Sequence, residues 1–283
     1  MNIRLAVILG AAALAVAAAG VGTWWYFDDS PPGAPPEALE AEGGEPLPIP
    51  PVPPRISESP DYDKCLSMLD SDPIGASEFA DVWESTGGGD EATHCHALAQ
   101  IALGNAETGA ELMDQLGRTG HSPPITRASI LGQAGQAWLM AGEADRAFDA
   151  ETLALKLSPD DPDLLINRAV AASVLERYPD VIADLNRALA LAPRRVDALV
   201  LRASAWREEA KLSQAREDIE RAMTIDPDNP DALLERGILR QRGGDDSGAR
   251  RDWQRAIELD PDSATADLAE QNLALLEAGP DRH

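Results

Sequence analysis

The chain is 283 residues long, enough for one or two domains of ordinary size, and its 49 acidic residues outnumber its 24 basic residues to give a formal net charge of −25. This balance argues against a nucleic-acid-binding role, because such binding depends on a basic face that neutralises phosphates and the basic residues here are dispersed among acids. The composition is 44% apolar but only 4% aromatic. Alanine and leucine supply most of the apolar residues, which favours helix.

An uninterrupted apolar run, LAVILGAAALAVAAAGVG, begins at Leu5 and is followed by TWWYF, which ends at residue 27. As a helix the run from Leu5 to residue 27 is about 34 Å long, and it would cross the ~30 Å hydrocarbon layer of a membrane. We therefore expect a transmembrane anchor over residues 1–27, with residues 5–27 in the membrane and Arg4 on the cytoplasmic side. The alternative is a signal peptide that is cleaved near Ala17–Ala19. Either interpretation exports the remaining chain.

Residues 28–60 are rich in proline and acidic side chains. Eleven of the 22 prolines of the chain lie in this segment, for example in PLPIPPVPPR. Such a segment buries little surface and stays extended. It is predicted to be a linker between the anchor and the domain that follows.

Beyond the linker, several columns of residues recur with one fixed period. The prolines that show it are Pro159, Pro193, Pro227 and Pro261. Two columns of small residues keep the same period, namely Ala154, Ala188, Ala222 and Ala256, and Gly135, Ala169, Ala203 and Gly237. A fixed period of this length indicates stacked supersecondary units.

Each unit reads as two helices joined by a turn. In the unit that ends at Pro193, Asp161 is a candidate N-cap, and apolar residues follow at helical spacing. The sequence ERYP interrupts this pattern, and Pro179 opens a second helix that Pro193 terminates. One such hairpin cannot bury both of its faces, so neighbouring hairpins are expected to stack.

The stretches NRAVAASVLERYPDVIADLNRALALAP and RGILRQRGGDDSGARRDWQRAIELDP resemble the tetratricopeptide repeat family. The resemblance implies an all-α fold, a right-handed α-solenoid of helical hairpins preceded by the transmembrane helix. It places four repeats at 128–263 and two divergent repeats at 57–127. The segment SATADLAEQNLALLEAG, over 264–279, is expected to be a capping helix that covers the last repeat.

In this family the first helices of the hairpins line a concave groove. The resemblance implies groove residues at Gln136, Ile166, Val170, Val200, Ser204, Leu234 and Ile238, with Arg207 and Arg242 nearer the rim. Most of these are aliphatic, which favours an apolar or amphipathic peptide or helix of a partner. The alternative is that the aliphatic residues pack against the next repeat and that the arginines form solvated ion pairs.

The only two cysteines, Cys65 and Cys95, are separated by nearly one period of the repeat. In an exported chain this pair predicts one disulfide between neighbouring first helices. His94 and His96 flank Cys95 and raise the question of a zinc site. Residues two apart on a helix diverge by about 200°, so no metal site is predicted there. Asp90, at the end of the STGGGD turn, is the expected N-cap of the helix that carries them.

No catalytic, cofactor or metal motif is found, and the chain is not expected to be an enzyme. We expect a scaffold or adaptor for a protein partner, anchored by a single pass in the bacterial inner membrane. Its amino terminus would be cytoplasmic and its repeats periplasmic. The alternative is a structural accessory subunit that packs in a membrane complex through its transmembrane helix, where Gly10, Ala11, Ala13, Ala17 and Gly20 allow close approach.

Overall fold

The computed structural model describes residues 55–278, and every regular element within that range is a helix. This confirms the all-α class for the described part of the chain. The predicted anchor at residues 1–27 lies outside the described residues, as does the linker up to residue 54. Among the helices of residues 55–278, none combines the length and the apolar character that crossing a membrane requires.

The described part of the chain contains thirteen helices. Their bounds are α2 Pro60–Leu69, α3 Pro73–Ser85, α4 Gly89–Ala102, α5 Ala106–Thr119, α6 Pro124–Met140, α7 Ala144–Leu157, α8 Pro162–Val174, α9 Tyr178–Leu191, α10 Val196–Glu208, α11 Leu212–Ile225, α12 Pro230–Arg242, α13 Asp246–Leu259 and α14 Ala264–Ala278.

The helices begin and end where the sequence supplies caps and prolines. At the start of α8 the carboxylate of Asp161 accepts hydrogen bonds from the backbone N–H groups of Asp163 and Leu164, and Pro162 is the first helical residue. The four periodic prolines each stand two residues beyond the last residue of α7, α9, α11 or α13. The helix–turn–helix unit predicted from the period of the sequence is therefore confirmed.

The start of α4 differs from the prediction, because its N-cap is Gly88 and Asp90 lies in the first turn. One carboxylate oxygen of Asp90 accepts hydrogen bonds from the backbone N–H of His121 at 2.8 Å and of Ser122 at 3.0 Å. The Ser122 hydroxyl donates to the same oxygen at 2.9 Å. Asp90 thus ties α4 to the segment between α5 and α6. The prediction that Asp90 is the N-cap was wrong. Its hydrogen-bond partners lie more than 30 residues away, and local sequence does not reveal such contacts.

The turn between the two helices of a hairpin has a residue with positive φ at the same position in five consecutive hairpins. Gly104, Gly142, Glu176, Ala210 and Gly244 have φ angles of 84°, 81°, 57°, 57° and 83°. Positive φ is unfavourable for any residue that carries a Cβ atom, yet two of these five are not glycine. The packing of the flanking helices therefore imposes the conformation of the turn.

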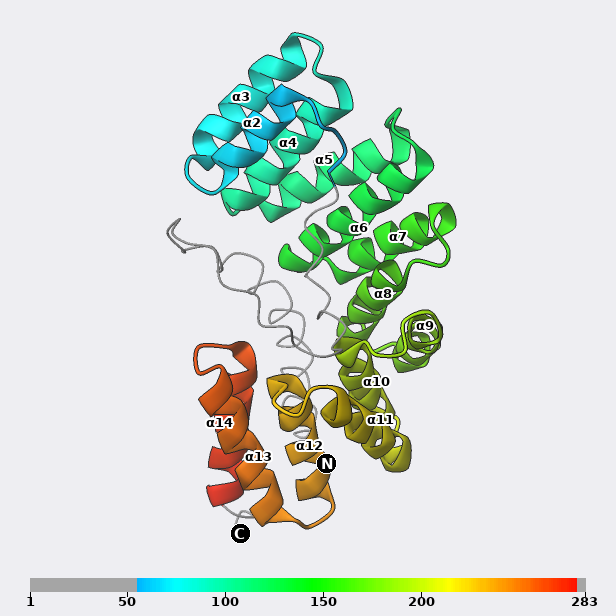
Figure 1. The fold of residues 1–283 in the computed structure, drawn as a ribbon, viewed down its shortest axis with the longest axis vertical. Coiled ribbons are helices and arrows are strands. Elements are labelled where there is room, and N and C mark those ends of the chain that lie inside the picture. The colour runs from blue at the N-terminus through cyan, green and yellow to red at the C-terminus, as the bar shows by residue number, and fades with distance from the viewer. Residues whose placement is uncertain (1–54, 279–283) are drawn as a thin grey trace, which may run out of the picture.

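The hairpins stack into an arc, shown in Figure 1. Helices α6, α8 and α10 lie on the inner side of the curve, while α7 and α9 lie on its outer side. Ala169 of α8 and Ala188 of α9 are fully buried, so the two helices of this hairpin pack closely. After α13, helix α14 packs against the last hairpin and buries Ala266 and Ala269.

Three hairpins contain the same buried ion pair, which the columns of proline and alanine did not reveal. In each, an arginine of the first helix forms two hydrogen bonds to an aspartate of the second helix, over 2.6–2.9 Å. The pairs are Arg168–Asp184, Arg202–Asp218 and Arg236–Asp252. The aspartate side chains are only 4–6% exposed. The arginines and the aspartates each recur with the same period as the prolines, so the pairs could have been predicted from the sequence.

The hairpin of α6 and α7 has a different interior. Ala134 and Ala150 stand at the positions of the arginine and the aspartate, and both are buried. The next residue, Glu151, is only 1% exposed, and neither of its carboxyl oxygens has a hydrogen-bond partner among the residues that the structure describes. A Cβ atom on Gly135 would lie 2.5 Å from Glu151 Oε1, so that glycine makes room for the carboxyl group. Burial raises the pKa of Glu151 well above its ordinary value of 4.5.

Glu151→Gln is expected to change how the stability of the protein depends on pH. Because the folded state holds the Glu151 proton more tightly than the unfolded state, wild type loses stability as the pH rises from about 4.5 toward the raised pKa. The glutamine variant lacks this term and should therefore gain stability relative to wild type over the same rise. Urea unfolding at a series of pH values measures the difference. Glu217→Gln, at an exposed position of α11, is the control and should leave the profile unchanged.

Candidate partner-binding surface

The nine residues predicted to line the groove all lie on the first helices of four consecutive hairpins. Gln136 is on α6; Ile166 and Val170 are on α8; Val200, Ser204 and Arg207 are on α10; Leu234, Ile238 and Arg242 are on α12. The structure thus brings them onto successive helices of the arc. Their accessibility differs greatly along this series.

The aliphatic members of the set take part in packing. Ile166 is 7% exposed and Leu234 is 8% exposed, and both belong to hydrophobic clusters that join neighbouring helices. Val170, Val200 and Ile238 are half-buried and pack against the same clusters or a neighbouring one. Little of this apolar surface remains for a partner. Substituting Ile166 with a charged residue would accordingly destabilise the fold itself.

Arg207 is engaged within the protein. It is 9% exposed, and its Nε donates to Glu235 Oε1 of α12 at 2.6 Å. Its other nitrogens donate to Glu208 and, at 3.0 Å, to the Ser204 hydroxyl. Arg207 therefore links α10 to α12 across two hairpins. Among the predicted residues, Arg242 is exposed, and Gln136 and Ser204 are partly exposed.

A row of aspartates marks the first turns of the inner helices, and the prediction did not include it. Asp163, Asp197 and Asp231 occupy the same position of α8, α10 and α12, each one period after the last. The side chains of Asp163 and Asp197 are 48% and 51% exposed, and Arg195 bridges them. The Thr265 hydroxyl donates to Asp231 at the end of the row. We call Asp163, Asp197 and Asp231 the acidic row. Its residue identity and spacing could have been found by comparing the repeats.

The structure brings Cys65 of α2 and Cys95 of α4 to disulfide distance, with their Cα atoms 6.2 Å apart. Both residues are fully buried, and Ala80 of α3 completes the cluster around them. A bond at this position would be structural, because buried sulfur atoms are not accessible to another thiol.

His94 and His96 point to different sides of α4, as their spacing predicts. The buried His94 accepts a hydrogen bond from the Tyr62 hydroxyl at 2.7 Å, and its Nε2 lies 2.9 Å from Gln133 Oε1. Burial lowers the pKa of His94 to about 4, so the ring is neutral and serves to join α2, α4 and α6. His96 faces α3 instead, where Asp81 lies 3.2 Å away.

Residues 201–274 match the sequence model of the tetratricopeptide repeat. No curated protein matches the chain in sequence. The fold is similar to that of PilF from Pseudomonas aeruginosa, with a TM-score of 0.57 and 14% identity over 75% of this chain and 96% of that one.

A thermophilic tetratricopeptide repeat protein of Thermus thermophilus has a TM-score of 0.53 and 16% identity, over 66% of this chain and 100% of its own. MamA from Desulfovibrio magneticus RS-1 has a TM-score of 0.53 and 20% identity, over 61% and 95%. At sequence identities this low, the structural similarity shows that the fold is shared and nothing more. The sequence match identifies tetratricopeptide repeats in residues 201–274, and the stacked hairpins of residues 55–278 share the fold of the tetratricopeptide repeat protein of Thermus thermophilus.

Proposed function

We propose that the protein is a non-catalytic scaffold that binds a basic peptide or helix of a protein partner along the inner side of the arc. The observation that carries this proposal is the acidic row, because the side chains of Asp163 and Asp197 are about half exposed at successive helix starts. Arg195 bridges the two carboxylates within the chain, and a cationic partner would compete with it for them. The apolar residues of the same helices are largely consumed by packing. A chain with a formal net charge of −25 also attracts a cationic segment over a distance.

A non-catalytic role is supported by the way in which the buried charges of the inner helices are used. Arg168, Arg202 and Arg207 each donate to a carboxylate of a neighbouring helix. These groups hold helices together and are not available to a substrate. The solenoid repeats one contact surface, which suits an extended segment of a partner.

In this proposal residues 5–27 anchor the protein in the bacterial inner membrane and the repeats face the periplasm. The apolar run and its aromatic end support the anchor. The buried cysteine pair at disulfide distance supports an oxidising compartment, where such bonds persist. The linker over residues 28–60 would hold the arc away from the lipid surface.

The double substitution Asp163→Asn and Asp197→Asn in the full chain is expected to weaken partner binding by about 10-fold or more. It removes two half-exposed negative charges and leaves Arg195 without its carboxylate partners, so that Arg195 repels a cationic segment. Partner that co-purifies from solubilised membranes is quantified for each variant, and circular dichroism confirms that the helical content is unchanged.

The matched control is Asp145→Asn with Glu217→Gln, which removes two exposed acids from the second helices α7 and α11. An equal loss in the control would show that only the overall charge matters. A different result supports the accessory-subunit alternative: the aspartate variant retains its partner, while replacing residues 5–27 with an unrelated membrane span abolishes association. That outcome would refute binding by the arc.

A further inference from the structure

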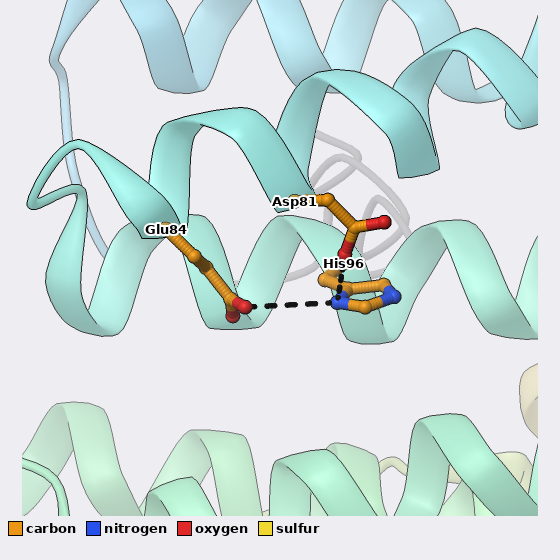
Figure 2. A group of neighbouring side chains, drawn as sticks. All are labelled: Asp81, Glu84 and His96. Carbon is orange, nitrogen blue, oxygen red and sulfur yellow. Dashed lines mark ion pairs between the residues drawn. The ribbon is translucent and has the colours of Figure 1, made fainter.

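Three side chains with metal-binding chemistry converge between α3 and α4. Figure 2 shows that Asp81 and Glu84 of α3 point toward His96 of α4. His96 Nδ1 lies 3.2 Å from Asp81 Oδ1 and 3.9 Å from Glu84 Oε2. One ligand atom from each residue lies within 4.8 Å of the other two. Two ligands that share an ion at bond lengths of about 2.1 Å and tetrahedral angles lie about 3.4 Å apart, so only small side-chain adjustments are needed.

The imidazole of His96 is held in place by its other nitrogen. His96 Nε2 lies 3.2 Å from the amide nitrogen of Gln100, which donates to the Ser77 hydroxyl at 3.0 Å. The Asn105 amide nitrogen donates to Gln100 Oε1 at 3.0 Å. Nδ1 is buried and makes no hydrogen bond to any of residues 55–278. Histidine ligands of metals characteristically have one nitrogen fixed by an outer group while the other is aimed at the ion. A histidine that binds a metal through Nδ1 carries its proton on Nε2, which then needs an acceptor. Rotation of the Gln100 amide about its last torsion would therefore accompany metal binding, because it brings Gln100 Oε1 to the position that accepts this proton.

We propose that Asp81, Glu84 and His96 bind a divalent transition-metal cation of the Zn²⁺ class. One imidazole nitrogen with two carboxylate oxygens favours such a cation over Mg²⁺ or Ca²⁺, which prefer oxygen ligands alone. The Asp81 side chain is 59% exposed and that of Glu84 is 34% exposed, so the cation reaches the site from solvent. Three protein ligands leave at least one position for water or for a group from a partner.

The same contacts have a simpler explanation, in which a protonated His96 forms an ion pair with the two carboxylates. The two explanations differ in their response to added metal. An ion pair gains nothing from Zn²⁺, whereas a metal site joins α3 to α4 more strongly once it is filled. His96 immediately follows Cys95, so the cation would reinforce the same hairpins that the cysteine pair joins.

Titration of the full chain in detergent, purified without a histidine tag and freed of metal by a chelator, tests the proposal. One equivalent of Zn²⁺ should bind at near-neutral pH and raise the melting temperature. Co²⁺ in its place should give visible absorption bands typical of a site with few ligands. His96→Ala and Asp81→Asn should each weaken Zn²⁺ binding by at least about 100-fold, because loss of an outer group alone costs 10- to 100-fold.

The control is His121→Ala, since this histidine is 97% exposed and lies 3.8 Å from a carboxylate oxygen of Asp90. It should bind Zn²⁺ as wild type does. Asp81→Asn changes an exposed side chain and keeps its shape, so it reports on binding even if His96→Ala unfolds the hairpin. The proposal is overturned if no stoichiometric binding occurs at micromolar Zn²⁺. It is equally overturned if Asp81→Asn and His121→Ala bind the ion alike.

Discussion

Arg168→Ala is expected to lower the free energy of unfolding by about 3 to 5 kcal/mol, the usual cost of removing one partner from a buried ion pair. The Asp184 side chain is 6% exposed, and Arg168 is the only basic residue that pairs with it in the described part of the chain. The substitution leaves a buried carboxylate without a counter-ion or its two donors. Asp218 and Asp252 each have a second arginine nearby, so their pairs should be less sensitive. Urea unfolding followed by circular dichroism measures the loss.

The double variant Arg168→Ala and Asp184→Ala should recover part of that stability. It recreates the arrangement at Ala134 and Ala150, which the hairpin of α6 and α7 uses without an ion pair. Arg187→Ala serves as the control, because its side chain is 51% exposed and its ion pair should contribute less than about 1 kcal/mol. If the single and double variants are equally unstable, the loss of stability comes from lost packing. The explanation that it comes from the unpaired Asp184 carboxylate would then be incorrect.

Loss of the Cys65–Cys95 bond is the second large effect that we expect. On the chain-entropy model, a bond that closes a loop over 30 residues of sequence contributes about 3 to 4 kcal/mol. Cys65→Ala with Cys95→Ala, or reduction of wild type, should therefore destabilise the hairpins from α2 to α5. Thermal unfolding with and without reductant measures the effect.

The double alanine variant provides the internal control, because reductant should no longer change its melting temperature. Protein isolated from cells with thiols blocked at lysis should contain no free cysteine. Modification of both cysteines in that protein would contradict the bond, and with it the oxidising compartment on which the proposed location depends.

The hairpins could be predicted because their determinants are local. A proline such as Pro193 ends a helix whatever surrounds it, and a small residue such as Ala188 is required wherever two helices touch. Because the same residues recur with a fixed period, the helical hairpin predicted for one repeat could be predicted for the others as well. Asp161 acted as the expected cap for the same reason, since its hydrogen bonds reach only two and three residues ahead.

The surface could not be predicted as well, because burial on a first helix depends on the neighbouring hairpins. Ile166 and Val170 are similar aliphatic residues on one helix, yet Ile166 is buried and Val170 is half-buried. Arg207 finds its partner Glu235 at a distance of 28 residues, which helical periodicity does not reveal. His96 likewise meets Asp81 and Glu84 only after α3 and α4 have packed together.

The shared turn at Gly104, Gly142, Glu176, Ala210 and Gly244 bears on how this molecule tolerates change over evolution. A left-handed conformation costs a residue with a side chain about 1 to 2 kcal/mol, and Glu176 and Ala210 adopt it nonetheless. The residue at this turn therefore adopts the left-handed conformation whatever its side chain, and the contacts between the helices determine the curvature of the arc. The turn residues can therefore be substituted without a change in the curvature of the arc. We expect related sequences to keep the buried arginine–aspartate pairs and the periodic alanines, while the turn residues vary.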